Sequence, residues 1–133
     1  MKTLLLLSLA AMTAFTNPTL DEQRPMTLND VCTAVGSGNV DQIISVVGGE
    51  VELVMPGKED VYTATTARAE LQAFFAQFEK TSYSKNHQGA SKSEDAEYCI
   101  GTLNTNKGSF RVYIYVAKKG DGVNLQELHI EPN

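Results

Sequence analysis

The sequence is poor in the residues on which small zinc-bound or disulfide-rich proteins depend. Its 133 residues include two cysteines, two histidines, four prolines and no tryptophan. Two cysteines cannot build a disulfide-dense miniprotein, and no Cys-x-x-Cys or Cys/His pair has the spacing of a structural zinc site. The fold must therefore rest on an apolar core, and the length suffices for one domain but not for two.

Basic residues are also few. Eleven Lys and Arg stand against sixteen Asp and Glu, which gives a net charge of −5, and the basic residues are scattered along the chain. There is no basic stripe that could follow a phosphate backbone, so we do not expect a nucleic acid as a partner.

The clearest apolar run lies at the N-terminus. Lys2 precedes a nearly unbroken apolar segment from Leu4 to Ala11, and small residues follow it. This pattern predicts a signal peptide over residues 1–14, cleaved between 11 and 16, and hence an exported protein, periplasmic or secreted. A buried N-terminal helix or a membrane anchor is the alternative. The run is shorter than the ~20 residues of a membrane span, so we expect no span after signal removal.

The rest of the chain predicts helices first and strands afterwards. Residues 15–26 are polar and aperiodic and predict a flexible tail, followed by one domain over 27–133. Apolar residues at helical spacing predict two short helices capped by Thr27 and Asn39, and later a Phe-rich helix capped by Thr65 or Thr66. Alternating or β-rich segments predict six strands, over 51–55, 61–64, 82–91, 96–103, 110–117 and 125–130.

The last two predicted strands allow a register to be chosen from side-chain chemistry. A three-residue loop of Gly120, Asp121 and Gly122 places Phe110 opposite Pro132. On one face it pairs Val112, Ile114 and Val116 with Ile130, Leu128 and Gln126. On the other it pairs Arg111, Tyr113 and Tyr115 with Glu131, His129 and Glu127. This register keeps apolar residues together and opposes unlike charges, whereas a slip of one residue mixes the faces.

This order of elements resembles the nuclear transport factor 2-like fold, also called cystatin-like, in which a strongly curved sheet wraps around helices to form a cone. The sequence is most similar to uncharacterised exported bacterial proteins that carry a domain of unknown function. The similarity rests on these segments: the signal peptide, Val51-Glu52-Leu53 with Pro56-Gly57-Lys58, Phe74-Phe75, His87 with Gly89, Tyr98-Cys99-Ile100-Gly101-Thr102-Leu103, Phe110-Arg111-Val112-Tyr113-Ile114-Tyr115 and Gln126-Glu127-Leu128. It implies an α+β fold with three helices on a mainly antiparallel sheet, and export, but no activity.

The apolar helix faces favour binding over catalysis. Enzymes of this superfold place Asp, His or Tyr inside the cone, whereas the helix faces here offer no proton-exchanging group apart from Cys32. We therefore expect a noncatalytic module for small-ligand binding or protein interaction, without a cofactor. A small apolar ligand would lie in the cone. Its expected lining, which would equally suit a filled core, is Leu53, Phe74, Phe78, Val112 and Ile114.

The alternative is a small cofactor-free isomerase or dehydratase with His87 as its base in the cone. His87 is expected to share a strand face with Tyr83, Lys85 and Gly89. A structural histidine bonded to a neighbouring strand, or simply solvated, is the competing interpretation. We expect no metal site at His87 or His129, because no third ligand has suitable spacing.

One predicted strand face is rich in polar and aromatic residues. Its members are Arg111, Tyr113, Tyr115, Glu127, His129 and Glu131. A solvated face, a ligand surface and a homodimer interface remain open as interpretations. The resemblance supports the interface, because the outer sheet face often makes dimers in this superfold.

The sequence leaves two interpretations of the cysteines open, a disulfide and two separate thiols. Export would permit a disulfide between Cys32 and Cys99. Two separate buried thiols are the favoured interpretation, because the sequence does not show that the two residues approach within bonding reach.

Overall fold

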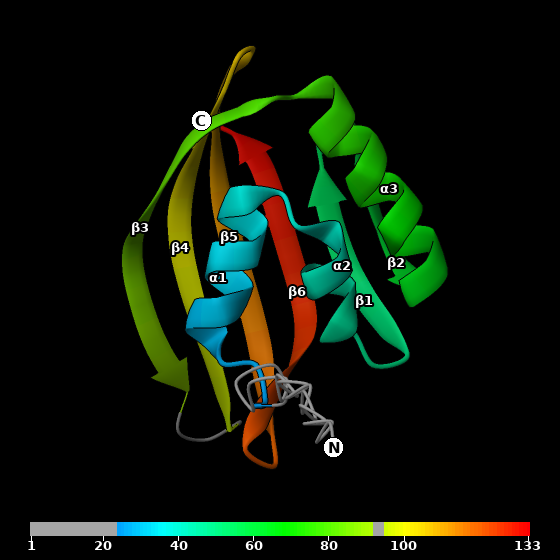
Figure 1. Cartoon of the computed structure of the whole chain (residues 1–133), viewed down its shortest axis with the longest axis vertical. Helices are drawn as coiled ribbons and strands as arrows, with labels where there is room; N and C mark the ends of the chain where they lie inside the picture. Colours follow the sequence, from blue (N-terminus) through cyan, green and yellow to red (C-terminus); the bar gives the residue numbers. More distant parts are fainter. Residues whose placement is uncertain (1–23, 92–94) are drawn as a thin grey trace, which may run out of the picture.

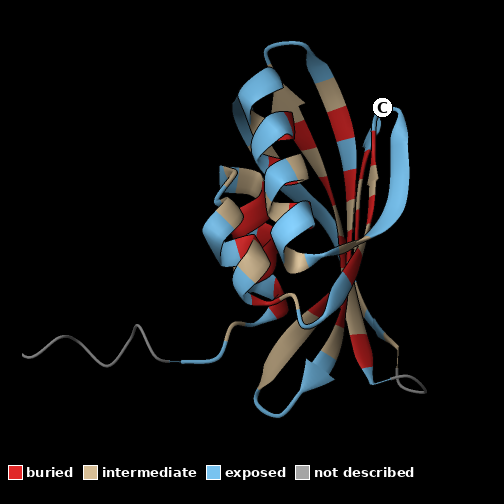
Figure 2. Ribbon diagram, turned by 90° about the vertical axis from the view of Figure 1, so that its right-hand side faces the viewer, coloured by how far each residue is buried: buried red, intermediate tan, exposed pale blue. Residues whose placement is uncertain are grey.

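A six-stranded curved sheet with three helices on one of its faces forms the domain. The computed structural model describes residues 24–91 and 95–133, and Figure 1 shows the helices in front of the sheet. In Figure 2 the helices lie on one side of the sheet, while the opposite face of the described sheet carries none. The expected α+β architecture is confirmed. The predicted signal peptide and the larger part of the predicted tail lie outside the described residues.

The first two helices begin at the residues that the sequence indicates. Helix α1 spans Leu28–Ser37, and Thr27 and Asp30 form a reciprocal capping box that satisfies two backbone N–H groups at its start. Helix α2 spans Val40–Ser45 and is capped by the side chain of Asn39. It ends before Val47, although Val47 continues the helical spacing of the apolar residues in this part of the sequence.

Helix α3 spans Ala64–Gln77 and begins earlier than expected. The hydroxyl of Thr63 accepts a hydrogen bond from the Thr66 N–H, so Thr63 is the cap, and the prediction of Thr65 or Thr66 is wrong. Three threonines lie within four positions, and any of them has the side chain of a cap. The end of strand β2 decides which threonine is the cap, because a capping residue needs an extended backbone. Thr63 is the last residue of β2 and has that conformation.

The strands are longer than their sequence patterns indicated. They are β1 Glu50–Met55, β2 Lys58–Thr63, β3 Lys80–Ser91, β4 Ala96–Thr105, β5 Gly108–Lys119 and β6 Gly122–Pro132. The order across the sheet is β2-β1-β6-β5-β4-β3. Every neighbouring pair is antiparallel except β1 and β6, which are parallel. The C-terminal strand therefore lies at the centre, beside the first strand of the chain (Figure 1).

The predicted register of β5 and β6 is confirmed over half of the hairpin. Phe110 faces Pro132 and Tyr115 faces Glu127, as expected, but Val116 faces Leu125 instead of Gln126. A β-bulge shifts the pairing by one residue, so the loop between the strands is shorter than the predicted three residues. Because of the bulge, both Leu125 and Leu128 face the core. Strict alternation of side chains along the strand would place only one of them there.

The core lies between the helices and the concave face of the sheet. Its buried side chains come from all three helices and from the inward-facing positions of β1, β4, β5 and β6. Rings of Phe74, Phe78 and Phe110 meet at one end, with centroids 4.9 to 5.4 Å apart. Among the described residues, no helix is long and apolar enough to cross a membrane.

Residues that precede the expected start of the domain at residue 27 make contacts with it. The Arg24 guanidinium donates two hydrogen bonds to Asp30, at 2.7 and 2.9 Å. The side chain of Met26 packs against the core. Residues 24–26, which the sequence pattern places in the tail, thus contact the folded domain.

Candidate functional site

Most of the residues expected to line the cone are in the core. Leu53, Val112 and Ile114 each have 0% of their surface accessible. A side chain with no accessible surface contacts neither solvent nor a cavity wide enough for a water molecule. These three residues are therefore packed by protein atoms, and the filled core is the interpretation that the structure supports at their positions.

Phe74 and Phe78 are close to an opening at the rim of the cone. They border a pocket of about 130 Å³ together with Met55, Lys58, Glu70 and other residues. Lys58 donates a hydrogen bond of 2.8 Å to Glu70 across it. This hydrogen bond, followed by the charge of the carboxylate, raises the pKa of Lys58. The pocket is smaller than the ~300 Å³ at which small-molecule sites usually begin.

His87 lies outside the cone. A bulge between Lys85 and His87 interrupts the alternation of β3, so Lys85 lies opposite Gly101 and His87 lies opposite Ile100. The Lys85 ammonium reaches Asn29 on α1, on the helix side of the sheet. His87 is exposed, and its Nε2 lies 3.1 Å from the Tyr98 hydroxyl. The expectation that His87 shares a face with Tyr83 and Lys85 is therefore wrong, because sequence alternation cannot reveal a bulge.

A row of rings crosses the helix-free face of the sheet. His87, Tyr98, Tyr113 and His129 come from β3, β4, β5 and β6, in that order. Successive ring centroids are 5.7, 6.2 and 5.3 Å apart. The pairing explains the row: Tyr113 lies directly opposite His129, and Tyr98 lies opposite Gly89, two residues beyond His87. We call these four residues the ring row.

A carboxylate pair and a histidine lie at one end of the ring row. Glu52 on β1 is the direct neighbour of Glu127 on the parallel strand β6, and His129 follows Glu127 on the same face. Donor atoms of the three residues lie within 4.8 Å of one another. Burial raises the pKa of Glu127, and the hydrogen bond and the charge of Glu52 raise it further, while the His129 charge opposes them. We call these residues the Glu-Glu-His cluster.

The structure brings together most of the polar face that the sequence predicted. Tyr113, Tyr115, Glu127 and His129 are half-buried on the helix-free face. Arg111 is exposed at the far end of β5, opposite Glu131. Sequence reasoning missed Glu52 and Tyr98 as members of this surface. The alternation of β1 indicated that Glu52 points away from the core, but not that β1 would pair with β6.

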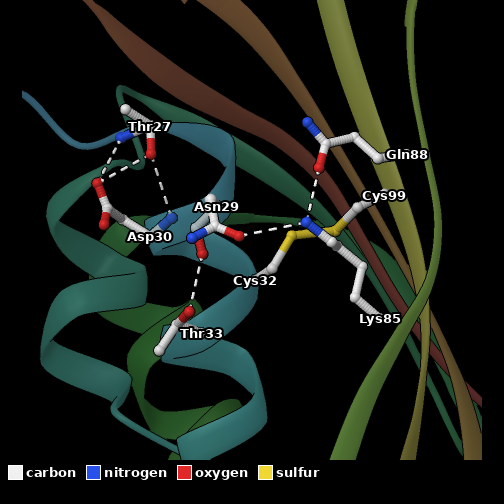
Figure 3. Close-up of a disulfide and its surroundings, with 8 residues drawn as sticks. All are labelled: Thr27, Asn29, Asp30, Cys32, Thr33, Lys85, Gln88 and Cys99. Atoms are coloured by element: carbon white, nitrogen blue, oxygen red, sulfur yellow. Dashed lines mark hydrogen bonds between the residues drawn. A yellow bond between two sulfur atoms is a disulfide. The ribbon is translucent and has the colours of Figure 1, made fainter.

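The helix side carries a disulfide between Cys32 of α1 and Cys99 of β4 (Figure 3). Both residues are buried, and no described cysteine is a free thiol. The expectation of two separate thiols is therefore wrong. α1 packs against β3 and β4, an approach that depends on tertiary packing and leaves no local signal in the sequence.

Comparison with known proteins identifies the family. Residues 28–131 match the model of a domain of unknown function, DUF4783. The chain therefore belongs to this family. No protein of curated function matches the sequence.

Solved structures agree with this assignment. A DUF4783 protein from Bacteroides uniformis is 27% identical, with a TM-score of 0.70 over 77% of this chain and 94% of that one. One from Bacteroides ovatus is 28% identical, with a TM-score of 0.70 over 77% and 92%. A cystatin-like protein of unknown function from Nostoc punctiforme is 14% identical, with a TM-score of 0.59 over 83% and 96%. This last likeness shows the fold alone.

Proposed function

We propose that this DUF4783 protein is an exported, noncatalytic interaction module that pairs with a second copy of itself through the helix-free face of its sheet. The ring row carries the proposal. Four ring-bearing side chains, one from each of four neighbouring strands, form a broad surface that no helix of the described chain covers. Tyrosine is enriched where protein interfaces concentrate their binding energy, because its ring buries a large area and its hydroxyl still finds a partner.

Two-fold pairing suits the chemistry of this face. Arg111 and Glu131 are near one end, and the Glu-Glu-His cluster is near the other. A two-fold axis through the face would bring Arg111 of one copy toward the carboxyl groups of the Glu-Glu-His cluster of the other. Val61 of β2, with 56% of its surface accessible, borders the acidic end and offers an apolar contact.

The disulfide supports export. Disulfides form and persist in oxidising compartments such as the periplasm and the cell exterior, and they are rare in the cytosol. The Cys32–Cys99 bond therefore agrees with the N-terminal apolar segment, which has the length and flanking residues of a signal peptide. Intact mass measurement of the protein from its own source tests this step: a chain that retains Met1 and the apolar segment would contradict it.

The alternative functions have less support from the geometry. Leu53, Val112 and Ile114 fill the cone, so they leave no room for an apolar ligand at their positions. A base at His87 would act from an exposed side chain on an edge strand, in contact with solvent. The isomerase or dehydratase hypothesis placed His87 in the cone, and the structure does not.

Sedimentation equilibrium of the oxidised protein tests the pairing. We expect a dimer for the natural sequence and a monomer for Tyr113→Lys, which places a charge in the middle of the ring row. Gln72→Lys adds the same charge at an exposed position of α3 on the opposite side, so this control should remain dimeric. A natural protein that sediments as a monomer, or a Gln72→Lys variant that dissociates equally, would overturn the proposal.

A further inference from the structure

The Glu-Glu-His cluster has the composition of a divalent metal site. It offers two carboxylates and one imidazole, the ligands that proteins use for zinc and for related divalent ions. The three donor atoms already lie within 4.8 Å of one another. An ion bound at ~2.1 Å by each donor requires donors about 3 to 4 Å apart. Small side-chain rotations would therefore suffice, without any change in the backbone.

The strand pairing holds the three side chains on one face. Glu127 and His129 are two positions apart on β6, so both point away from the helices. Glu52 is directly opposite Glu127 in the parallel pair of β1 and β6. Because this pair lies inside the sheet, between β2 and β5, its backbone is held on both sides. The site would therefore be built on a rigid support, as a metal site requires.

Within the sheet, neither carboxylate has a lysine or arginine as its direct neighbour. Within the sheet, the other neighbour of Glu52 is Val61, and the other neighbour of Glu127 is Tyr115. Among the residues that the structure describes, the ion pairs of Lys and Arg involve other acids, Asp30, Asp41, Glu70 and Glu97. Like charges directly opposite each other destabilise a sheet. A bound dication would turn this repulsion into attraction.

His129 supplies an independent observation. Its Nε2 is buried and has no hydrogen-bond partner within the described structure. A buried polar atom without a partner is uncommon and has a cost, and an ion is one of the groups that accounts for such an atom. In this protein the atom belongs to the residue that stands beside the carboxyl groups of Glu52 and Glu127.

We propose that Glu52, Glu127 and His129 bind one divalent transition-metal ion, with Zn²⁺ as the best fit, on the helix-free face. Zn²⁺ accepts mixed oxygen and nitrogen ligands, and imidazole and carboxylate sites bind it more tightly than Mn²⁺. Three protein ligands leave at least one coordination position open. That position would face the depression bordered by Val61, Tyr115 and Gln126, where water or a carboxylate of another molecule has access. This site does not depend on the proposed pairing.

Calorimetric titration of the metal-stripped, oxidised protein with ZnCl₂ tests the site. We expect saturable binding of one Zn²⁺ per chain, and a loss of affinity of about tenfold or more for Glu52→Gln, Glu127→Gln and His129→Gln. Glu79→Gln, an exposed acid on the helix side, and His87→Ala, the other histidine, are the controls and should retain full affinity. Circular dichroism verifies that each variant is folded.

A Co²⁺ titration followed by visible absorption gives a second readout. The natural protein should show bands that saturate at one equivalent, and the bands should disappear in His129→Gln. Absence of saturable binding would overturn the proposal. So would a loss in His87→Ala equal to that in His129→Gln, or unchanged affinity in Glu52→Gln. Equal metal affinity at protein concentrations below and above the range in which the chain pairs shows that the site is independent of pairing.

Discussion

The ring of Tyr83 lies against the α-carbon of Gly101 on the neighbouring strand. A β-carbon built on Gly101 would be 2.5 Å from the Tyr83 hydroxyl oxygen and 2.8 Å from the carbonyl oxygen of Ser84. The same ring lies over Gly36 of α1, where a β-carbon would be 2.5 Å from it. Tyr83 thus fills a slot between α1 and β4 that exists because both positions are glycine, and burial raises the pKa of its hydroxyl.

Gly101→Ala should therefore destabilise the protein. One added methyl group collides with a ring and a backbone oxygen, and overpacking of this kind costs about 1 to 3 kcal/mol. Urea unfolding followed by circular dichroism measures the change. Gly49→Ala is the matched control, since no atom lies within 4 Å of a β-carbon at Gly49. Equal stability of the two variants would show that Tyr83 does not occupy the slot.

Removal of the disulfide should cost much of the stability. The bond joins residues 67 positions apart, and closing a loop of that length in the unfolded chain is worth about 4 kcal/mol on the loop-entropy estimate. We expect a large fall in the unfolding midpoint for Cys32→Ala with Cys99→Ala, and also for the natural protein in reductant. Reductant should leave the double variant unchanged. Alkylation of two thiols in the denatured but unreduced natural protein would contradict the bond.

The Asp30 carboxylate should contribute stability that acid removes. Its hydrogen bond to Arg24, followed by that to the Thr27 N–H, holds the pKa of Asp30 well below its usual range. A depressed folded pKa means that the contribution is complete above the unfolded pKa of ~3.9 and declines as the pH falls below it. Asp30→Asn should cost about 1 kcal/mol at pH 7, because an uncharged acceptor makes weaker hydrogen bonds.

The pH dependence separates this charge effect from a change in packing. The stability difference between the natural protein and Asp30→Asn should be constant from neutral pH down to about pH 5 and should shrink in more acidic solution. Urea titrations at a series of pH values measure it. A difference that stays constant into strong acid would mean that the charge of Asp30 has no part in it. Asp121→Asn, in the exposed loop of the last hairpin, is the control and should have little effect.

Tyr98 and His87 should differ in their importance to the sheet. The Tyr98 ring covers Gly89 and contacts Tyr113, so Tyr98→Ala should cost roughly 1 to 2 kcal/mol through lost cross-strand contacts on both sides. His87→Ala removes one exposed hydrogen bond and a ring at the edge, and it should cost less than about 1 kcal/mol. Thermal unfolding compares the two. A greater loss for His87→Ala would indicate a structural role that its exposure does not suggest.

Local features were predicted well because their causes are local. The Thr27 cap needs only Asp30 three residues later, and the Asn39 cap needs only the turn that follows it. The pairing of Tyr113 with His129 followed from a hairpin whose strands are adjacent in the sequence. The register shifts in β3 and β6 were missed, because one extra residue in a strand changes every facing pair beyond it without altering composition or turn signals.

The candidate site was predicted in part for the same reason. Arg111, Tyr113, Tyr115, Glu127 and His129 were placed on one surface because β5 and β6 form a hairpin. His87 joined them only through a bulge in β3, and Glu52 only through the parallel pairing of the first and last strands. A partner so distant along the chain leaves no periodic signal, so the sequence offered no third ligand for His129.

The sequence by itself determined where the first two helices begin, which strand faces are apolar and that one core would contain them. These properties depend on capping side chains and on periodicity, which act over a few residues. Tertiary structure alone decided that Cys32 bonds to Cys99, that the cone is filled at Leu53, and that Glu52 stands beside Glu127 and His129. Each of these depends on how distant segments pack, and long-range contacts are set by the whole fold and not by neighbouring residues.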